Sequence, residues 1–366
     1  MISSIIEYLD PKSRVNLSRC SKYLYKIDAK IPLVLKEVRI GRRLNDENSP
    51  RSCREKVIDL KFSNNVSGSV FFKKQGGRVR FSPKSSYNWE VMEYEHMEKN
   101  RRKRENGENE DYTGLALYSE EGETIIDVMF MFIEHFLRRA KYEVEKFEIY
   151  IETVKRYKFE KMITANKVIL SQSQAFRLRQ FGKFVKNICI INEHDEECFL
   201  IPDTESIRTA HALYLGYSGI LSTALLDMFG ARYLFLPKAC ICTSIVINQY
   251  IKQWVNSSVD NNFEHFESRC RLSLKPVILL GVKHVKWDEK MVDREKLNMG
   301  ERFKRLLDQG ELFQIWHSSG QMSATLRLEH GPGCYYLTFT VTGRRDANGI
   351  ERFEVSDVHR QYQHFN

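Results

Sequence analysis

Short apolar segments with an L-x-L spacing recur through the middle of the chain. They are centred on Phe147/Ile149, Val168/Leu170, Ile188/Ile190, Leu213/Leu215 and Leu234/Leu236. Their first apolar positions lie 21, 20, 25 and 21 residues apart, within the period range of leucine-rich-repeat-like solenoids. A unit of one strand and one helix cannot bury its own apolar face, so such units stack and offer an extended concave surface. The pattern predicts an α/β solenoid that binds rather than catalyses.

Two of the segments between these strands have a helical pattern. Residues 220–229 end at Gly230, a favoured residue just beyond a helix. Residues 243–255 carry one apolar stripe, formed by Val246, Ile247, Tyr250, Ile251 and Trp254. Strand, loop and helix within about 21 residues give parallel strands joined by right-handed crossovers.

The same register puts a second set of side chains on the concave face. This set is Glu148, Tyr150, Ile169, Cys189, Ile191, Tyr214 and Phe235. Aromatic residues at the centre of a patch often carry binding energy, so Glu148, Tyr150, Tyr214 and Phe235 are the predicted target-binding residues. The alternative is that these side chains are buried on both faces, as parallel strands under helices usually are.

The first thirty residues predict three short helices. Ile2, Ile5, Ile6 and Leu9 have the spacing of one helical face, and Asp10 with Pro11 restarts a helix as N-cap and first-turn proline. Ser21 can cap a third segment, which carries Leu24 and Ile27 inward. It ends near Ile31 because Pro32 disfavours helical geometry in the residue before it. So small a bundle needs a neighbouring domain or a partner.

Alternating patterns predict antiparallel strands on both sides of the repeats. Before them, residues 34–40 and 57–62 read as strands, Gly76-Gly77 joins a hairpin, and residues 125–140 form an amphipathic helix. After them, residues 324–328 and 335–341 form a hairpin around Gly331-Pro332-Gly333. The predicted domains are 1–33, 34–143 with a charged flexible insertion at about 93–112, 144–343, and a C-terminal appendage at 344–366.

The composition predicts a globular intracellular protein. Of 366 residues 42% are apolar, and the net charge of +9 is only suggestive of an anionic partner. The basic run at 99–104 fits a nuclear-localisation or nucleic-acid-binding segment, but a solvated loop is favoured. Eight dispersed cysteines and no secretory signal indicate a cytoplasmic or nuclear location. The most apolar stretch, residues 125–136, is shorter than the roughly 20 residues that a membrane span needs.

Chemistry-bearing motifs are scarce in the sequence. There is no Gly-rich phosphate loop, nucleophile elbow or His-Glu-x-x-His helix, which argues against the common enzyme classes and predicts no cofactor. A zinc site is conceivable at His194, Cys198, Cys240 and Cys242, but the spacing is poor and a surface turn is favoured. Cys189, Cys240 and Cys242 are predicted to pack as small apolar residues. Asp127 and Glu134, seven apart, are predicted to be solvated carboxylates.

Two segments resemble a known family. The run Ile5-Ile6-Glu7-Tyr8-Leu9-Asp10-Pro11, followed by Leu17-Ser18-Arg19-Cys20 and Ile31-Pro32-Leu33, resembles a shortened F-box of the expanded nematode type. Residues 243–282, with Lys252 and Trp254, and the segments from Ile315-Trp316 to Val341 resemble the type-2 F-box-associated domain. The resemblance implies that the N-terminal helices dock on a Skp-family adaptor and, through it, on a cullin. The residues that would bind the adaptor are Ile5, Ile6, Leu9, Asp10, Pro11, Arg14, Leu17, Cys20, Leu24 and Pro32.

The first functional hypothesis is therefore a non-catalytic substrate-recognition subunit of a cullin-based ubiquitin ligase. It would hold an unidentified target protein on the solenoid. The alternatives are a stand-alone interaction scaffold whose helices merely cap the solenoid and, less favoured, a nucleic-acid binder that uses residues 99–104. No membrane partner is predicted.

Overall fold

The computed structural model describes residues 21, 23, 26–27, 30–42, 56–62, 67–75, 78–84, 117–118, 124–151, 157–191, 204–216, 220–221, 226, 229–236, 241–257, 263–271, 275–288, 310–331, 334–345 and 351–353. The chain divides into two compact units, Met1–Val185 (unit 1) and Lys186–Asn366 (unit 2). Each unit is described by itself.

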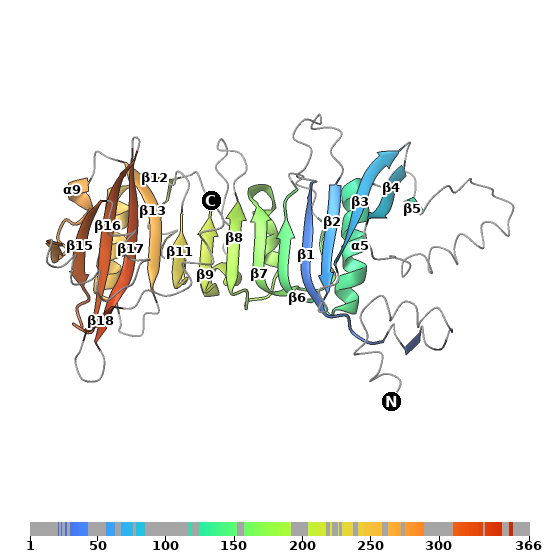
Figure 1. Ribbon diagram of the computed structural model, residues 1–366, viewed down its shortest axis with the longest axis horizontal. Helices are drawn as coiled ribbons and strands as arrows, with labels where there is room; N and C mark the ends of the chain where they lie inside the picture. The colour runs from blue at the N-terminus through green and yellow to red at the C-terminus, as the bar shows by residue number, and fades with distance from the viewer. Residues whose placement is uncertain are drawn as a thin grey trace. The chain divides into compact units, whose positions relative to one another are not determined.

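Unit 1 contains a mixed sheet (Figure 1). Its strands are β1 (Leu35–Arg42), β2 (Lys56–Phe62), β3 (Ser67–Gln75), β4 (Arg78–Lys84), β5 (Leu117–Tyr118), β6 (Glu143–Ile149) and β7 (Thr164–Ser171). From β1 through β5 the neighbours are antiparallel. On its other side β1 pairs in parallel with β6, and β6 pairs in parallel with β7. The parallel repeat strands thus continue directly from an antiparallel block.

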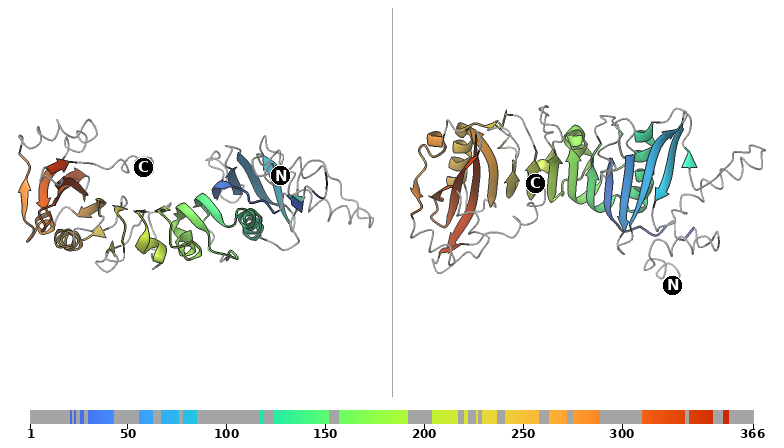
Figure 2. Two further views of the ribbon diagram at one scale, coloured as in Figure 1. Left: turned by 90° about the horizontal axis from the view of Figure 1, so that it is seen from below. Right: turned by 45° about the horizontal axis from the view of Figure 1, so that its top comes forward.

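One face of the unit 1 sheet is covered by helical segments, α5 (Ile125–Arg139) and the 3-10 segment η2 (Gln172–Gln180). Figure 2 shows α5 against that face. The hydroxyl of Thr124 caps α5 by accepting a hydrogen bond from the Asp127 N–H. Strand and helix interlock through aromatic rings, as between Phe72 and Phe132, whose centroids lie 5.9 Å apart. The alternation along β2 therefore buries Ile58, Leu60 and Phe62 here.

Unit 2 also contains a mixed sheet. Parallel neighbours are β8 (Asn187–Ile191), β9 (Ala212–Leu215), β11 (Tyr233–Phe235) and β13 (His265–Arg271). Beyond β13 follow antiparallel strands β17 (Cys334–Arg345), β16 (Met322–Gly331), β15 (Glu311–Trp316) and β14 (His284–Lys286). The short strands β10 (Ile220–Leu221) and β12 (Ile241–Cys242) pair in parallel, and β18 (Glu351–Phe353) pairs with β17.

The helices of unit 2 are α6 (Glu205–Thr209), α8 (Ser244–Val255) and α9 (Lys275–Ile278) in the described part of the chain. Thr243 caps α8, and Trp254 near its end packs edge-on against Phe339 of β17 with ring centroids 5.1 Å apart. The Asn248 amide donates to the carbonyls of Ile278 and Leu280, 2.9 Å each. These bonds satisfy carbonyls at the end of α9.

Many local predictions are confirmed. The five repeated apolar segments are all strands, and those within one unit pair in parallel. The predicted strands at 34–40 and 57–62 are also present, and the strands that flank Gly76-Gly77 and residues 332–333 pair in antiparallel as predicted. So are the helices predicted at 125–140 and 243–255.

The predicted fold class is wrong. In place of a three-helix F-box-like segment and an α/β solenoid, the described residues form mixed sheets with five helical segments. The antiparallel strands pair with β6 and β13 and so extend the sheets of the parallel strands. Between the parallel strands the described residues are helical in η2, α6, α8 and at Leu226, but Ile220–Leu221, the predicted start of the helix at 220–229, is a strand.

Other predictions fall largely outside the described residues. These are the first two N-terminal helices and the charged insertion at 93–112. Of the third N-terminal helix, Tyr23, Lys26 and Ile27 are helical. In the predicted appendage after residue 343, β17 continues to Arg345 and pairs with β18.

Candidate functional site

The face of the unit 1 sheet opposite α5 carries charged side chains, which we call the charged face. It consists of Glu37 and Arg39 on β1, Asp59 and Lys61 on β2, Lys146 and Glu148 on β6, and Tyr150 directly after β6. The register sets Glu37 between Lys61 and Lys146, and Arg39 between Asp59 and Glu148. Opposite charges are therefore direct cross-strand neighbours, which favours this register.

Ion pairs connect the strands of the charged face. Lys61 Nζ lies 2.9 Å from Glu37 Oε1, and Arg39 Nε lies 3.7 Å from Glu148 Oε2. Glu148 also pairs with Lys146, and the Arg39 guanidinium lies 5.3 Å from the centroid of the Tyr150 ring. Arg39 and Lys61 remain about 40% exposed, at 39% and 41%, so they stay available to a partner. A half-exposed arrangement of arginine, tyrosine and alternating charge is suited to protein recognition.

The four predicted target-binding residues fall into two environments. Glu148 and Tyr150 belong to the charged face, where Tyr150 is half-buried and Glu148 is 6% exposed. In unit 2, Tyr214 and Phe235 lie on the sheet face opposite α8 but are 7% and 4% exposed. Burial on both faces, the alternative raised by the sequence, thus describes these positions of unit 2.

A buried polar row on this unit 2 face is not evident from the sequence. His265 of β13 is 1% exposed and packs against Phe235, with ring centroids 5.1 Å apart. Its Nδ1 lies 2.8 Å from the hydroxyl oxygen of Thr340, its cross-strand neighbour on β17. Its Nε2 lies 3.7 Å from Glu267 Oε2. A signal in the sequence is that His265 and Glu267, two residues apart on a strand, share one face.

The row of hydroxyl, imidazole and carboxylate has the residue types of nucleophilic catalysis. However, Thr340 is 8% exposed and His265 is 1% exposed, so a substrate carbonyl has no access to the hydroxyl. The row is therefore best explained as a structural link between β13 and β17. Nearby, burial, followed by the proximity of Cys189 and Glu267, raises the pKa of Tyr214 to about 12.

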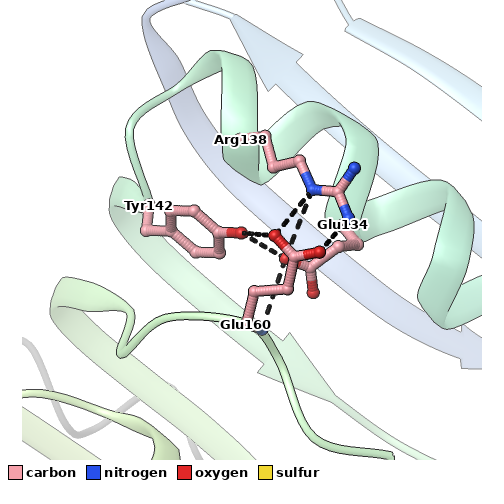
Figure 3. Close-up of polar contacts among 4 residues, drawn as sticks. All are labelled: Glu134, Arg138, Tyr142 and Glu160. Atoms are coloured by element: carbon pink, nitrogen blue, oxygen red, sulfur yellow. Dashed lines mark hydrogen bonds and ion pairs between the residues drawn. The ribbon is translucent and has the colours of Figure 1, made fainter.

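A second polar cluster lies at the C-terminal end of α5 (Figure 3). The Tyr142 hydroxyl donates to Glu134 and lies 3.3 Å from Glu160 Oε2, while Arg138 Nε donates to Glu160 Oε2 at 3.0 Å. The Glu160 N–H donates to Glu134 Oε1 at 3.4 Å. Burial, followed by the hydrogen bond and charge of Glu134, raises the pKa of Tyr142. Tyr142 therefore stays a protonated donor.

This cluster fixes the turn from α5 into β6. Tyr142 has φ 61°, a left-handed conformation that costs a tyrosine about 1–2 kcal/mol. Its N–H donates to the carbonyl of Leu137 at 2.7 Å, and its hydroxyl is held by Glu134. The prediction that Glu134 is a solvated carboxylate is wrong, because Glu134 is 2% exposed. The i, i+4 spacing of Glu134 and Arg138 is a sequence signal for this cluster.

The predicted adaptor-binding residues are mostly outside the described residues. These are Ile5, Ile6, Leu9, Asp10, Pro11, Arg14, Leu17, Cys20 and Leu24. Pro32 is described and half-buried, between buried Ile31 and Leu33. The Leu33 N–H donates to the carbonyl of Arg139 at the end of α5, 2.9 Å away. The chain that follows the predicted helices is therefore held against the C-terminal end of α5 within unit 1.

The predictions about the zinc site, the cysteines and a membrane span are tested only where the structure describes the residues. His194, Cys198 and Cys240 lie outside the described residues, as does the Cys242 side chain. The described residues include no group of three side chains suited to hold a metal ion. Cys189 packs as a buried residue, as predicted. No helix in the described ranges combines the length and apolar character needed to cross a bilayer.

Comparisons of this chain with protein-family models, curated proteins and solved structures gave no match. The function is therefore argued from the chain's own residues.

Proposed function

We propose that this protein is a non-catalytic substrate-recognition subunit of a cullin-based ubiquitin ligase, which binds a target protein through the charged face. The observation that carries the binding role is the half-exposed row of ion-paired side chains with Tyr150 on the face opposite α5. Exposed charges of alternating sign select partners and orient them more than they add affinity.

The ligase part of the proposal rests on the N-terminal residues. The resemblance of residues 5–33 to a shortened F-box implies a Skp-family adaptor as the partner. The mechanism is positional, because holding the target beside a conjugating enzyme raises the effective concentration of its lysines. This chain would then supply no catalytic group.

The test is co-purification of the full chain with a purified Skp-family adaptor. Replacing Leu9 and Leu24 by aspartate should abolish the association, because apolar helix positions would then carry charge. Lys26→Glu is the matched control, since Lys26 is exposed in the same segment. Failure of the unaltered chain to bind the adaptor would exclude the ligase role and leave a stand-alone scaffold.

Target binding is tested separately on the charged face. Arg39→Glu with Tyr150→Ala should remove a cross-linked target from the chain while the adaptor is retained. The pair Lys158→Glu with Phe184→Ala is the control, because both residues are exposed in unit 1 and lie outside the strands of the charged face. Equal retention of the target by both variants would argue against the charged face as the binding surface.

A further inference from the structure

Two turns of unit 1 repeat the same short sequence pattern. Phe159-Glu160-Lys161-Met162-Ile163 and Phe181-Gly182-Lys183-Phe184-Val185 each consist of a phenylalanine, a variable residue, a lysine, a large apolar residue and a β-branched residue. The first and last residues of each pattern are buried, at 3% exposure or less. The large apolar residue is exposed instead, at 60% for Met162 and 74% for Phe184. Both turns therefore present an apolar side chain to solvent at the same position.

The two turns are held side by side. The Ile163 N–H donates to the Gln180 carbonyl, and the Gly182 N–H donates to the Ile163 carbonyl, at 2.9 Å each. The phenylalanine that begins each pattern packs on the ring of Phe147, with centroids 6.0 Å away for the first pattern and 5.4 Å for the second. The exposed apolar side chains therefore project from a well-packed support.

Lysines surround these apolar side chains. Lys161 and Lys183 directly precede them and are both exposed. Lys161 Nζ lies 5.9 Å from the centroid of the Tyr142 ring, and Lys183 Nζ lies 5.3 Å from the centroid of the ring that follows it, contacts in which an ammonium group keeps its charge. Lys141 is exposed in a neighbouring turn, which the 2.8 Å bond from the Thr164 N–H to the Tyr142 carbonyl joins to the first pattern.

The carboxylates of these turns leave an excess of positive charge. Glu160 accepts from Arg138 Nε at 3.0 Å, so these two charges balance each other. No ion pair joins Lys141 or Lys158, both exposed, to a described residue. The other carboxylate in the described part of these turns is that of Glu143, at the start of β6. We use the name lysine edge for Lys141, Lys158, Lys161, Met162, Lys183 and Phe184.

We propose that the lysine edge docks on the surface of a bilayer that contains anionic lipids. Met162 and Phe184 enter the boundary between headgroups and acyl chains, and the lysines pair with lipid phosphates. Such a contact involves one leaflet and needs no spanning segment, which is why the length of the apolar stretches predicts no membrane partner. This inference goes beyond the proposed function, since it concerns where the protein is held and not which target it takes.

The residue types favour a bilayer over a protein partner. Interfaces between proteins are enriched in tyrosine, tryptophan and arginine and depleted in lysine. The lysine edge contains lysines, and Arg138 beside it is paired with Glu160. A lysine on its flexible stem can follow mobile phosphates, and a bilayer accepts Met162 and Phe184 without a matching pocket.

The first experiment measures binding of the full chain to large vesicles by sedimentation. Vesicles of phosphatidylcholine with about 30% phosphatidylserine are compared with vesicles of phosphatidylcholine alone. We expect binding to the anionic vesicles to be about tenfold tighter or more, and to weaken as salt rises. Equal binding to the two kinds of vesicle, or binding to neither, would overturn the proposal.

Apolar variants test whether side chains enter the lipid. Phe184→Ala should weaken binding about tenfold and Met162→Ala about threefold, because each removes apolar area from the contact. Met131→Ala is the matched control and should leave the affinity unchanged, since Met131 is 44% exposed in the middle of α5. If Phe184→Ala bound as tightly as the unaltered chain, or if the two methionine variants lost equally, the docking site would be rejected.

Charge variants test whether the lysines contribute. Lys161→Glu should weaken binding to the anionic vesicles about tenfold, since it reverses a charge at the lipid surface. Lys73→Glu makes the same charge change at an exposed position and should leave the affinity unchanged. The register sets the start of β3 beside the start of β1, and Lys73 lies further along β3. Equal weakening by both variants would make the attraction a property of net charge and exclude the site.

The second experiment detects insertion directly. Phe184→Trp should add tryptophan fluorescence that vesicles with brominated acyl chains quench, because the indole lies at the acyl boundary. Met131→Trp should add fluorescence that these vesicles do not quench. If the fluorescence added by Phe184→Trp were not quenched either, a different surface would hold the vesicles and the proposal would fail. Target retention and adaptor co-purification should be the same for Phe184→Ala and the unaltered chain, so failure here is distinct from failure of the proposed function.

Discussion

The sheet faces opposite the main helices differ between the two units. In unit 1 this face carries half-exposed ion pairs, such as Lys61 with Glu37. In unit 2 it carries buried aromatic and polar side chains, such as Phe235 and His265, at 4% and 1% exposure. Both faces have the same alternation along the strands, so the pattern assigns a residue to a face without revealing whether that face is open.

The difference teaches which interactions hold each face. Exposed ion pairs contribute little because water and salt screen them. A buried hydrogen bond between His265 and Thr340 contributes more, since breaking it leaves a polar group without water. The unit 1 face can therefore change its partners at little cost, whereas the unit 2 face is part of the core.

The largest expected effect distinguishes the two aromatic candidates. Phe235→Ala removes a buried ring and should destabilise unit 2 by about 3–4 kcal/mol, whereas Tyr150→Ala at a half-exposed position should cost about 1 kcal/mol. Three of the four tryptophans, Trp254, Trp287 and Trp316, lie in unit 2, so urea unfolding followed by tryptophan fluorescence reports on unit 2 once Trp89 of unit 1 is replaced by Phe in every variant. Hydrogen exchange of β6 reports on unit 1. Equal losses would show that the two faces are equally buried.

The next effect concerns the buried polar row. Thr340→Val removes the hydroxyl 2.8 Å from His265 Nδ1 and should cost about 1–3 kcal/mol. In the background of His265→Phe the same change should cost much less, because the imidazole is gone. A double-mutant cycle, with the free energy of unfolding measured in urea, gives the interaction energy between Thr340 and His265. Additive effects would mean that the two side chains do not interact.

A smaller, pH-dependent effect is expected at Tyr214. Its pKa is raised to about 12 by burial, followed by Cys189 and Glu267, so folding favours the neutral phenol. This contribution to stability is fully present below pH 10 and is lost as the pH rises from 10 to 12. Tyr214→Phe should lose less stability over that interval than the unaltered chain. The urea midpoints of the two proteins, measured at each pH, give this difference.

Local structure was predictable where the sequence pattern is strictly local. Alternation at 57–62 identified β2, and the apolar stripe of residues 243–255 identified α8. The architecture was not predictable, because the L-x-L spacing identifies the parallel strands but not the antiparallel strands that extend their sheets. The pairings of β1 with β6 and of β13 with β17 join segments far apart in sequence. No local pattern encodes them.

The candidate sites were predictable to a similar extent. Glu148 and Tyr150 were found because strand alternation assigns them to one face. Their partner Arg39 was missed, since it lies on a strand more than a hundred residues earlier. Glu134 was misjudged because its burial depends on Tyr142 and Glu160, which approach only after α5 turns into β6.

The smallest expected effect is at the charged face. Lys61→Met removes the ion pair with Glu37, whose side chains are 41% and 38% exposed, and should change unit 1 stability by no more than about 0.5 kcal/mol. Raising the salt from about 0.05 to 0.5 M should shrink even that difference. Hydrogen exchange of the β1 and β2 amides measures the stability change at each salt concentration. Lys73→Met, at an exposed position of β3, is the control. If Lys61→Met lowered the stability as much as Thr340→Val does, the charged face would be held as tightly as the buried face of unit 2. There would then be no reason to regard the charged face as a binding surface.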